Sequence, residues 1–349
     1  MTGRFGTALA SSGPARLARA ASTTRVGLIG LAVARIGLAA IALLNYAVHF
    51  ADRQYLWGPD GVWPWDVFVE QLDTDGSFSL YTLSSSTTVF DLLYVGGVLA
   101  ALLFLLGVLP RVTALVHWAF LWSLYERNPS LLDGGDNLTY VLLPLFCLVE
   151  SNRYLAVGAA ARRARLAGAL PSDAPVPARR MLASQVHNVA WLTMVGQIVV
   201  VYVLSGLYKA GGELWQNGSA LYYAMRTDEF RWPGLSEHFY ENALFVGTGT
   251  WFTVAFQLAF PFLLFSRTGR ALAFTGAVLL HLQIAVFMGI VTFSLTMIFS
   301  EAMIVDDATY RRVAALSRDL RRAVRGRLGA RGRETSPRAA GAEAETTHG

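Results

Sequence analysis

Long apolar stretches with few or no charged residues alternate along this chain with segments that hold most of its charge. About 20 apolar residues cross a hydrocarbon core about 30 Å thick, so stretches of this kind predict transmembrane helices. Six of them predict one span each, at residues 26–50, 88–109, 112–127, 138–149, 188–208 and 243–265. The pattern predicts an all-α, polytopic transmembrane helix bundle.

The last apolar run differs from the others in its length. Residues 271–300 form an uncharged run of 30 residues, long for one span and short for two. A single span would leave the arginine-rich end of the chain outside, whereas two short spans hinged near Met288 and Gly289 return it to the cytoplasm. We expect this hairpin, which gives about eight spans with both termini cytoplasmic, and the single span is the alternative.

The distribution of charge assigns the sides of the membrane. Arginine is concentrated in residues 1–25, 151–184 and 308–349, and acidic residues are in excess in 51–87 and 210–242. By the positive-inside rule the first group is cytoplasmic and the second lies outside. Three regions follow: a disordered basic leader, a transmembrane domain and a disordered basic cytoplasmic tail, at residues 1–25, 26–307 and 308–349.

Composition narrows the class of protein further. Apolar residues make up 54% of the chain and charged residues 15%, whereas a soluble domain carries nearer 25% charged residues. The net charge of +5 comes from arginines in loops and tails, so it indicates a lipid bilayer as partner, and no nucleic acid. Cys147 is the only cysteine, so no disulfide framework or cysteine-built metal site is expected. We predict a multi-pass protein of a bacterial-type plasma (inner) membrane, with no metal.

Lys209 is the most informative single residue. It is the only lysine among 29 fixed cations and follows directly on the uncharged span 188–208. Arginine keeps its proton near neutral pH, whereas lysine in an apolar setting can release it, so a base here has to be Lys209. Tyr202 and Ser205 are spaced to share its helix face. The alternatives are that Lys209 extends to the lipid headgroups and that the polar face only packs helices.

Other polar residues are candidates for the same site. The turn that contains Asp136 and Asn137 falls on the outer side, as Lys209 does, and two glycines let it turn tightly. His281 lies within the last apolar run, and Arg35 within the first span. Ionisable groups inside a membrane need internal partners and tend to be functional, although a buried histidine hydrogen-bonded to a neighbouring helix is the simpler reading. Motifs of hydrolases, NTPases and dinucleotide-binding enzymes do not occur.

Several of these segments together look like the HTTM (horizontally transferred transmembrane) domain, the membrane module shared with vitamin K-dependent γ-glutamyl carboxylase. The resemblance covers residues 26–307 and extends to the short B-type maturation proteins of sporulation-delaying toxins. Its most specific part is the block from Tyr202 through Lys209 to Trp215 and Gly218. The segments that carry it read ARIGLAAI, GPDGVWP, NPSLLDGGDNL, QIVVVYVLSGLYKAGGELWQNGSALYYAM and HLQIAVFMGIVTFS.

The resemblance implies a chemistry for these positions. Lys209 corresponds to the lysine that deprotonates reduced vitamin K, and Asp136 and Asn137 stand where the carboxylase has an Asn-His pair. The histidine of that pair is therefore absent, and the chain has no large outer domain for a propeptide. We assign Lys209, His281, Asp136 and Asn137 as catalytic candidates. The candidates for binding a reduced quinone of the menaquinol type are Tyr202, Ser205, Trp215 and Arg35.

Three functions remain open at this stage. The first is a quinol-dependent enzyme, a carboxylase-like lyase or oxidoreductase, that modifies an exported peptide with Lys209 as base. The second is a non-enzymatic maturation or immunity factor that binds a secreted peptide toxin or another small partner protein. The third is a small-solute or proton transporter that uses Arg35, His281 and Lys209. Matching halves with broken helices, which would favour transport, are not evident.

Overall fold

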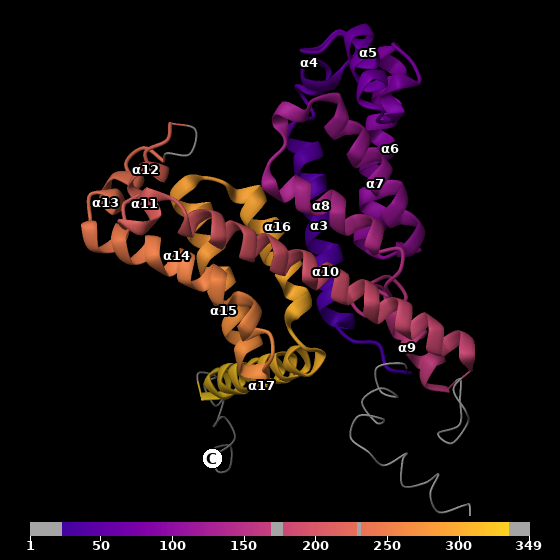
Figure 1. Ribbon diagram of the computed structural model, residues 1–349. Coiled ribbons are helices and arrows are strands. Elements are labelled where there is room, and N and C mark those ends of the chain that lie inside the picture. Colours follow the sequence, from indigo (N-terminus) through magenta and orange to yellow (C-terminus); the bar gives the residue numbers. More distant parts are fainter. Residues whose placement is uncertain (1–22, 169–176, 229–231, 335–349) are drawn as a thin grey trace, which may run out of the picture. The chain divides into compact units, whose positions relative to one another are not determined.

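The computed structural model describes residues 23–168, 177–228 and 232–334 and is all-helical over these ranges (Figure 1). The chain divides into two compact units, Met1–Asp307 and Ala308–Gly349. The long helices of the first unit are α3 (Leu28–Val48), α6 (Thr87–Leu106), α7 (Pro110–Arg127), α8 (Gly134–Leu145), α10 (Ala178–Ala210), α14 (Ala243–Leu263), α15 (Arg267–Met288) and α16 (Val291–Glu301).

Shorter helices connect these elements. They are α4 (Arg53–Trp57), α5 (Trp65–Asp75), α9 (Ala159–Gly168), α11 (Glu213–Gln216), α12 (Ala220–Ala224) and α13 (Ser236–Tyr240). Three 3₁₀ turns complete the first unit: η1 (Leu80–Thr82), η2 (Pro129–Leu131) and η3 (Ala302–Ile304).

Five described helices are long and apolar enough to cross a bilayer, namely α3, α6, α10, α14 and α15. The other expected spans correspond to α7, to α8 and to α16, which are shorter or more polar. The sequence therefore locates eight helices in the right places, while the structure supports a span by length and composition for five of them.

The break in the last apolar run falls where the sequence analysis placed it. Helix α15 ends at Met288, Gly289 has a positive φ of 69°, and α16 begins at Val291. Glycine is needed there because a Cβ atom would lie 2.4 Å from Nε1 of Trp232. The two halves are unequal, however: α15 begins at Arg267 and has 22 residues, whereas α16 has 11. The expectation of two short spans is thus wrong for the first half.

Helix α16 connects two groups of helices. Helix α3 packs against α6, α6 against α7, and α7 against α8. Helix α16 packs against both α8 and α3, which completes the first group. The second group consists of α10, α14 and α15, and α15 packs against α16 (Figure 1). One continuous core extends through both groups and includes Leu38, Leu142, Met194, Phe260 and Met297. Residues near the start of α16 consequently contact both groups.

Arg35 is fully buried and holds together backbone segments at one end of the first group. Its guanidinium donates to the carbonyl oxygens of Phe104 at 2.7 Å, Ser151 at 3.2 Å and Leu155 at 2.6 Å, and also to that of Leu105. The carbonyls of Phe104 and Leu105 lie in the last turn of α6, and those of Ser151 and Leu155 lie outside the helices, where regular helical donors are missing. An arginine at mid-membrane depth costs roughly 2.5 kcal/mol or more, and the carbonyl groups offset this cost.

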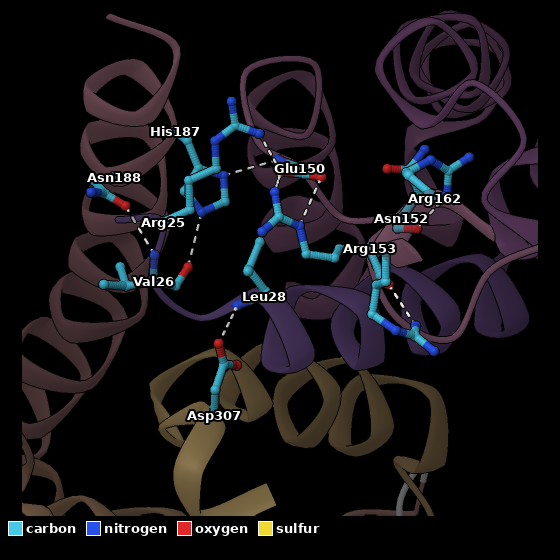
Figure 2. Close-up of polar contacts among 11 residues, drawn as sticks. Arg25, Val26, Leu28, Glu150, Asn152, Arg153, Arg162, His187, Asn188 and Asp307 are labelled. Carbon is cyan, nitrogen blue, oxygen red and sulfur yellow. Dashed lines mark hydrogen bonds and ion pairs between the residues drawn. The ribbon is translucent and has the colours of Figure 1, made fainter. Parts of the chain in front are cut away.

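A polar cluster fixes the start of α3 (Figure 2). The Asp307 carboxylate accepts hydrogen bonds from the backbone N–H groups of Leu28 at 3.3 Å and Ile29 at 2.8 Å. The Asp307 carboxylate takes the place of an N-cap side chain, because the N-cap residue Gly27 has no side chain to accept these hydrogen bonds. His187 accepts from the N–H of Glu150 at 2.9 Å through Nδ1, so its Nε2 carries the proton donated to the Val26 carbonyl.

Glu150 is the acidic centre of this cluster and is 9% exposed. Its carboxylate pairs with Arg153 at 2.8 Å and with Arg25 (Figure 2). Burial by itself would raise the pKa of Glu150, but the two guanidinium groups outweigh it and hold this pKa below its usual value.

The structure differs from the expected disordered tail over part of its length. Helix α17 covers Asp307–Glu334, where the sequence is rich in alanine, arginine and leucine, which are strong helix formers. Pro337 follows soon after the helix, and residues 335–349 lie outside the described residues. Most of the basic leader, residues 1–22, also lies outside them.

The ion pairs of Glu150 predict a dependence of stability on acid pH. Because the folded-state pKa is lowered, the stabilisation is complete above the ordinary value of about 4.5 and is lost as pH falls through the folded-state pKa. The purified protein in detergent should therefore show a melting temperature that drops below about pH 5. A Glu150→Gln variant should melt lower at neutral pH and lose less on acidification. Equal acid-induced drops in the two proteins would contradict this.

Candidate functional site

A cavity of about 260 Å³ lies between the helices of the second group and α16. Its walls are mostly apolar and come from α10, α11, α12, α14, α15 and α16. Five of the residues selected from the sequence line it: Tyr202, Ser205, Lys209, Trp215 and His281. An apolar cavity with a few convergent polar groups is the usual form of a small-molecule site.

The Lys209 end of the cavity is built on one face of α10. Ser205 precedes Lys209 by one helical turn, and Nζ donates a hydrogen bond of 2.5 Å to Ser205 Oγ. The amine lies 5.3 Å from the centre of the Trp215 ring, on the short helix α11 that follows α10. Gln257 of α14 reaches the same hydroxyl at 3.4 Å through Nε2, and its Oε1 is buried without a hydrogen-bond partner.

A second polar group of three side chains lies deeper, where α10, α15 and α16 meet. The Tyr202 hydroxyl donates to Oε1 of Glu301 at 2.5 Å and lies 3.0 Å from Nε2 of His281. Because the phenol proton is used for Glu301, Nε2 of His281 has to carry the proton of the second bond. Nδ1 of a neutral His281 is then an acceptor, and it has no hydrogen-bond partner in the described structure. Oε2 of Glu301 is also unpartnered.

Packing fixes the orientation of this group. The Tyr202 ring stacks on Phe260 with a centroid distance of 4.0 Å and an interplanar angle of 6°. His281 packs edge-on against Phe293 at 5.5 Å, and its Nε2 is 3.3 Å from Oε1 of Glu301. The group can therefore pass a proton along a preformed path of hydrogen bonds at the edge of the cavity.

Glu301 and Gln257 were missed by the sequence analysis. Glu301 is the first charged residue after the uncharged run 271–300, and it is 0% exposed. An acid directly after an apolar run looks like the end of a span, yet the chain continues into η3 without leaving the core. The signal available from the sequence was the apolar segment that follows, from Ala302 to Val305. Gln257 is an uncharged polar residue in an apolar span and gives a weaker signal.

The remaining candidates are not brought to this cavity. Asp136 lines a second cavity, described below, together with Asp133. Residues 134–137 form the first turn of α8, with Asp133 as N-cap, and do not form the expected turn. Asn137 is exposed. Arg35 binds the backbone carbonyls described above and is not among the residues that line either cavity.

Metal binding has no support in the described residues, which contain no group of three or more His, Cys, Asp or Glu side chains that could hold a metal ion.

Comparison with known proteins relates the chain to one family. The family described as the HTTM domain matches residues 77–307, a range that includes every residue lining the cavity and Glu301. The chain is 25% identical over 203 residues to the uncharacterized protein YitO of Bacillus subtilis (strain 168). That match covers 56% of this chain and 60% of the relative. No solved structure matches the chain.

The deeper polar group predicts a loss of stability on removal of one hydroxyl. Tyr202→Phe leaves Glu301 with one fewer donor, and a hydrogen bond to a charged group contributes about 1.5–3 kcal/mol. The melting temperature in detergent should fall by several degrees. Tyr208→Phe is the matched control, because Tyr208 lies on the same helix and is 86% exposed. The hydrogen-bond assignment is wrong if both variants melt with the parent protein.

Proposed function

The chain belongs to the HTTM domain family, and we propose that it is a quinol-dependent membrane enzyme that modifies an exported peptide with Lys209 as base. The observation that carries this proposal is the position of Lys209, the only lysine in the chain, in the wall of an apolar cavity that also contains His281. The family is one of membrane domains of carboxylase-like proteins, which supports a reaction of this class.

The lining of the cavity supports a quinol ring, a planar aromatic group with two oxygens on opposite sides, as the proposed occupant. Its lining is mainly apolar, and polar groups are placed at two ends, around Lys209 and around His281. Two buried atoms, Nδ1 of His281 and Oε1 of Gln257, have no protein partner and suit a ligand hydroxyl. Lys209, Ser205 and Gln257 would hold one oxygen of the ring, and His281 the other.

A bound quinol supplies a hydroxyl that can be deprotonated and a ring that reacts with molecular oxygen to drive modification of the peptide. Lys209 in its neutral form accepts the hydroxyl proton at Nζ. Ser205 Oγ, 2.5 Å from Nζ, orients the amine, and the Trp215 ring at 5.3 Å stabilises the ammonium that forms. A cation over an aromatic ring gains about 0.5–2 kcal/mol.

The deeper group would serve the opposite end of the ring. Nδ1 of His281 would accept a hydrogen bond from the second hydroxyl, while Nε2 is held by Tyr202 and Glu301. A proton taken up at Nδ1 would make His281 an imidazolium, which the Glu301 carboxylate at 3.3 Å stabilises. Tyr202, His281 and Glu301 thus act as a second proton-handling group, separate from Lys209.

The bacterial-type plasma membrane is the proposed location, with the Lys209 end of α10 outside. The acidic excess of residues 51–87 and 210–242 and the arginines of 151–184 support this orientation. A quinol would then reach the cavity from the lipid, and the peptide from the outer side.

Lys209→Arg tests the base directly. Arginine keeps the positive charge and the contact with Trp215 but cannot accept a proton near neutral pH. Oxygen consumption by the protein in nanodiscs that contain menaquinol should fall by about 10² or more, the contribution typical of a positioned base. The melting temperature should stay close to that of the parent protein.

Arg226→Lys is the matched control for this experiment. Arg226 also packs over an aromatic ring, that of Tyr222 at 4.8 Å, but it is outside the cavity lining. Oxygen consumption should be unchanged by this exchange. If Lys209→Arg consumes oxygen and matures a peptide as the parent does, Lys209 is not the base, and the binding-factor function takes its place.

A further inference from the structure

A second cavity, of about 250 Å³, lies in the first helix group and shares no lining residue with the first. Its walls come from α3, α4, α7 and α8 and from Thr292 of α16. The sequence predicted that Asp136 lies near Lys209, but Asp136 lines this second cavity instead. The function proposed above therefore does not use the second cavity. Its chemistry has to be judged from its own residues.

Two carboxylates form one end of the second cavity. Oδ1 of Asp133 caps α8 by accepting from the N–H groups of Gly135 and Asp136, and its Oδ2 accepts from the Thr292 hydroxyl at 3.3 Å. Asp136 accepts from the Tyr125 hydroxyl at 2.6 Å and from the N–H of Asp133 at 3.1 Å. All these donors are neutral. Over the described ranges, neither carboxylate forms an ion pair with a lysine or an arginine.

The remaining walls combine aliphatic side chains with aromatic rings and a few polar groups. Rings of Tyr46, Trp57 and Tyr125 line the cavity, and no lysine or arginine does. Asn128 is 4% exposed, and its Nδ2 donates to the Leu56 carbonyl at 3.1 Å. Its Oδ1 is buried without a hydrogen-bond partner. An unpaired buried acceptor is costly, so this oxygen is an independent sign that a donor belongs in the cavity.

A buried arginine, Arg127, is the last residue of α7 but does not line the second cavity. Its Nη2 donates to the carbonyls of Gly58 at 2.6 Å and Trp63 at 2.5 Å, and the guanidinium lies over the Phe68 ring. Its Nη1 is buried without a hydrogen-bond partner among the described residues. Among the described lining residues, His49 is the only histidine, and it packs edge-on against Trp57 at 5.5 Å. Within the described ranges, therefore, no lysine or arginine pairs with the two carboxylates.

We propose that the second cavity binds an organic cation, the ammonium or guanidinium group of a small amine or of a basic peptide side chain. Carboxylates attract such a group and accept its hydrogen bonds, and aromatic faces bind it through their quadrupoles. The described residues offer no group of three ligating side chains, which favours an organic cation over a metal ion. This inference does not depend on the quinol chemistry of the first cavity.

The two cavities share one structural element. Ile290 and Phe293 line the first cavity, whereas Thr292 lines the second and donates to Asp133. All three residues follow the break at Gly289. Only the first turn of α16 would therefore separate a cation held by Asp133 and Asp136 from the Lys209 cavity. In that position the cation could belong to the peptide substrate proposed above and anchor it.

Binding can be measured with the purified full chain in nanodiscs by isothermal titration calorimetry. The probes are n-butylammonium and n-butylguanidinium, with n-butanol and n-butyrate as the neutral and anionic comparisons. We expect saturable binding of the two cations only. Asp136→Asn should weaken it at least tenfold, and Asp133→Asn should do the same while keeping a good N-cap residue.

Two variants serve as controls. Asp60→Asn makes the same charge change at an exposed acid outside both cavities, and Lys209→Arg changes only the first cavity. Both should bind the cations as the parent does, so failure of the quinol proposal leaves this result standing. Asp133→Asn covers the case that Asp136→Asn does not fold. Equal binding of n-butanol and n-butylammonium, or undiminished binding by a folded Asp133→Asn or Asp136→Asn protein, would overturn the proposal.

A peptide arm distinguishes the two sources of the cation. The probe is an acetylated, amidated five-residue alanine peptide with one central lysine, compared with the same peptide carrying norleucine. Tighter binding of the lysine peptide than of n-butylammonium identifies a peptide side chain as the occupant. Binding of n-butylammonium alone identifies a small free amine.

Discussion

Every polar group inside an apolar helix bundle needs a partner from the protein, because lipid offers none. This constraint explains where the polar residues of the present chain are found. Arg35 is stable in the core because backbone carbonyls in the last turn of α6 and in the loop after α8 accept its hydrogen bonds. Glu301 is stable there because Tyr202 and His281 surround one of its oxygens. Both contacts join helices that are far apart in the sequence, so they also fix the fold.

The same constraint makes the exceptions informative. Nδ1 of His281, Oε2 of Glu301 and Oε1 of Gln257 have no partner, and all belong to residues at or directly behind the wall of the first cavity. In the second cavity Oδ1 of Asn128 has none, and two carboxylates there lack a cation. Unpartnered buried atoms also occur away from the cavities among the described residues, as at both ring nitrogens of His117. It is the coincidence of such atoms with a cavity that favours a binding site.

The sequence predicts much of the fold and part of the site. Apolar periodicity and charge locate eight helices and the break at Gly289, since both depend on local composition. The common face of Tyr202, Ser205 and Lys209 also follows from helical spacing alone. The contact of Tyr202 with Glu301 does not, because 99 residues separate them in the chain. The sequence placed Asp136 near Lys209 because both residues are expected on the outer side of the membrane. A shared side gives a similar depth but does not say which helix group each residue belongs to.

The quinol proposed for the first cavity would lie with one oxygen at Lys209, and a cryo-EM structure of the full chain in nanodiscs loaded with a reduced menaquinone can test this. We expect ring density between Lys209 and His281, with one oxygen within about 3 Å of Nζ and the other near Nδ1. A ring bound elsewhere, or a cavity filled by acyl chains with Nζ still on Ser205, would contradict it.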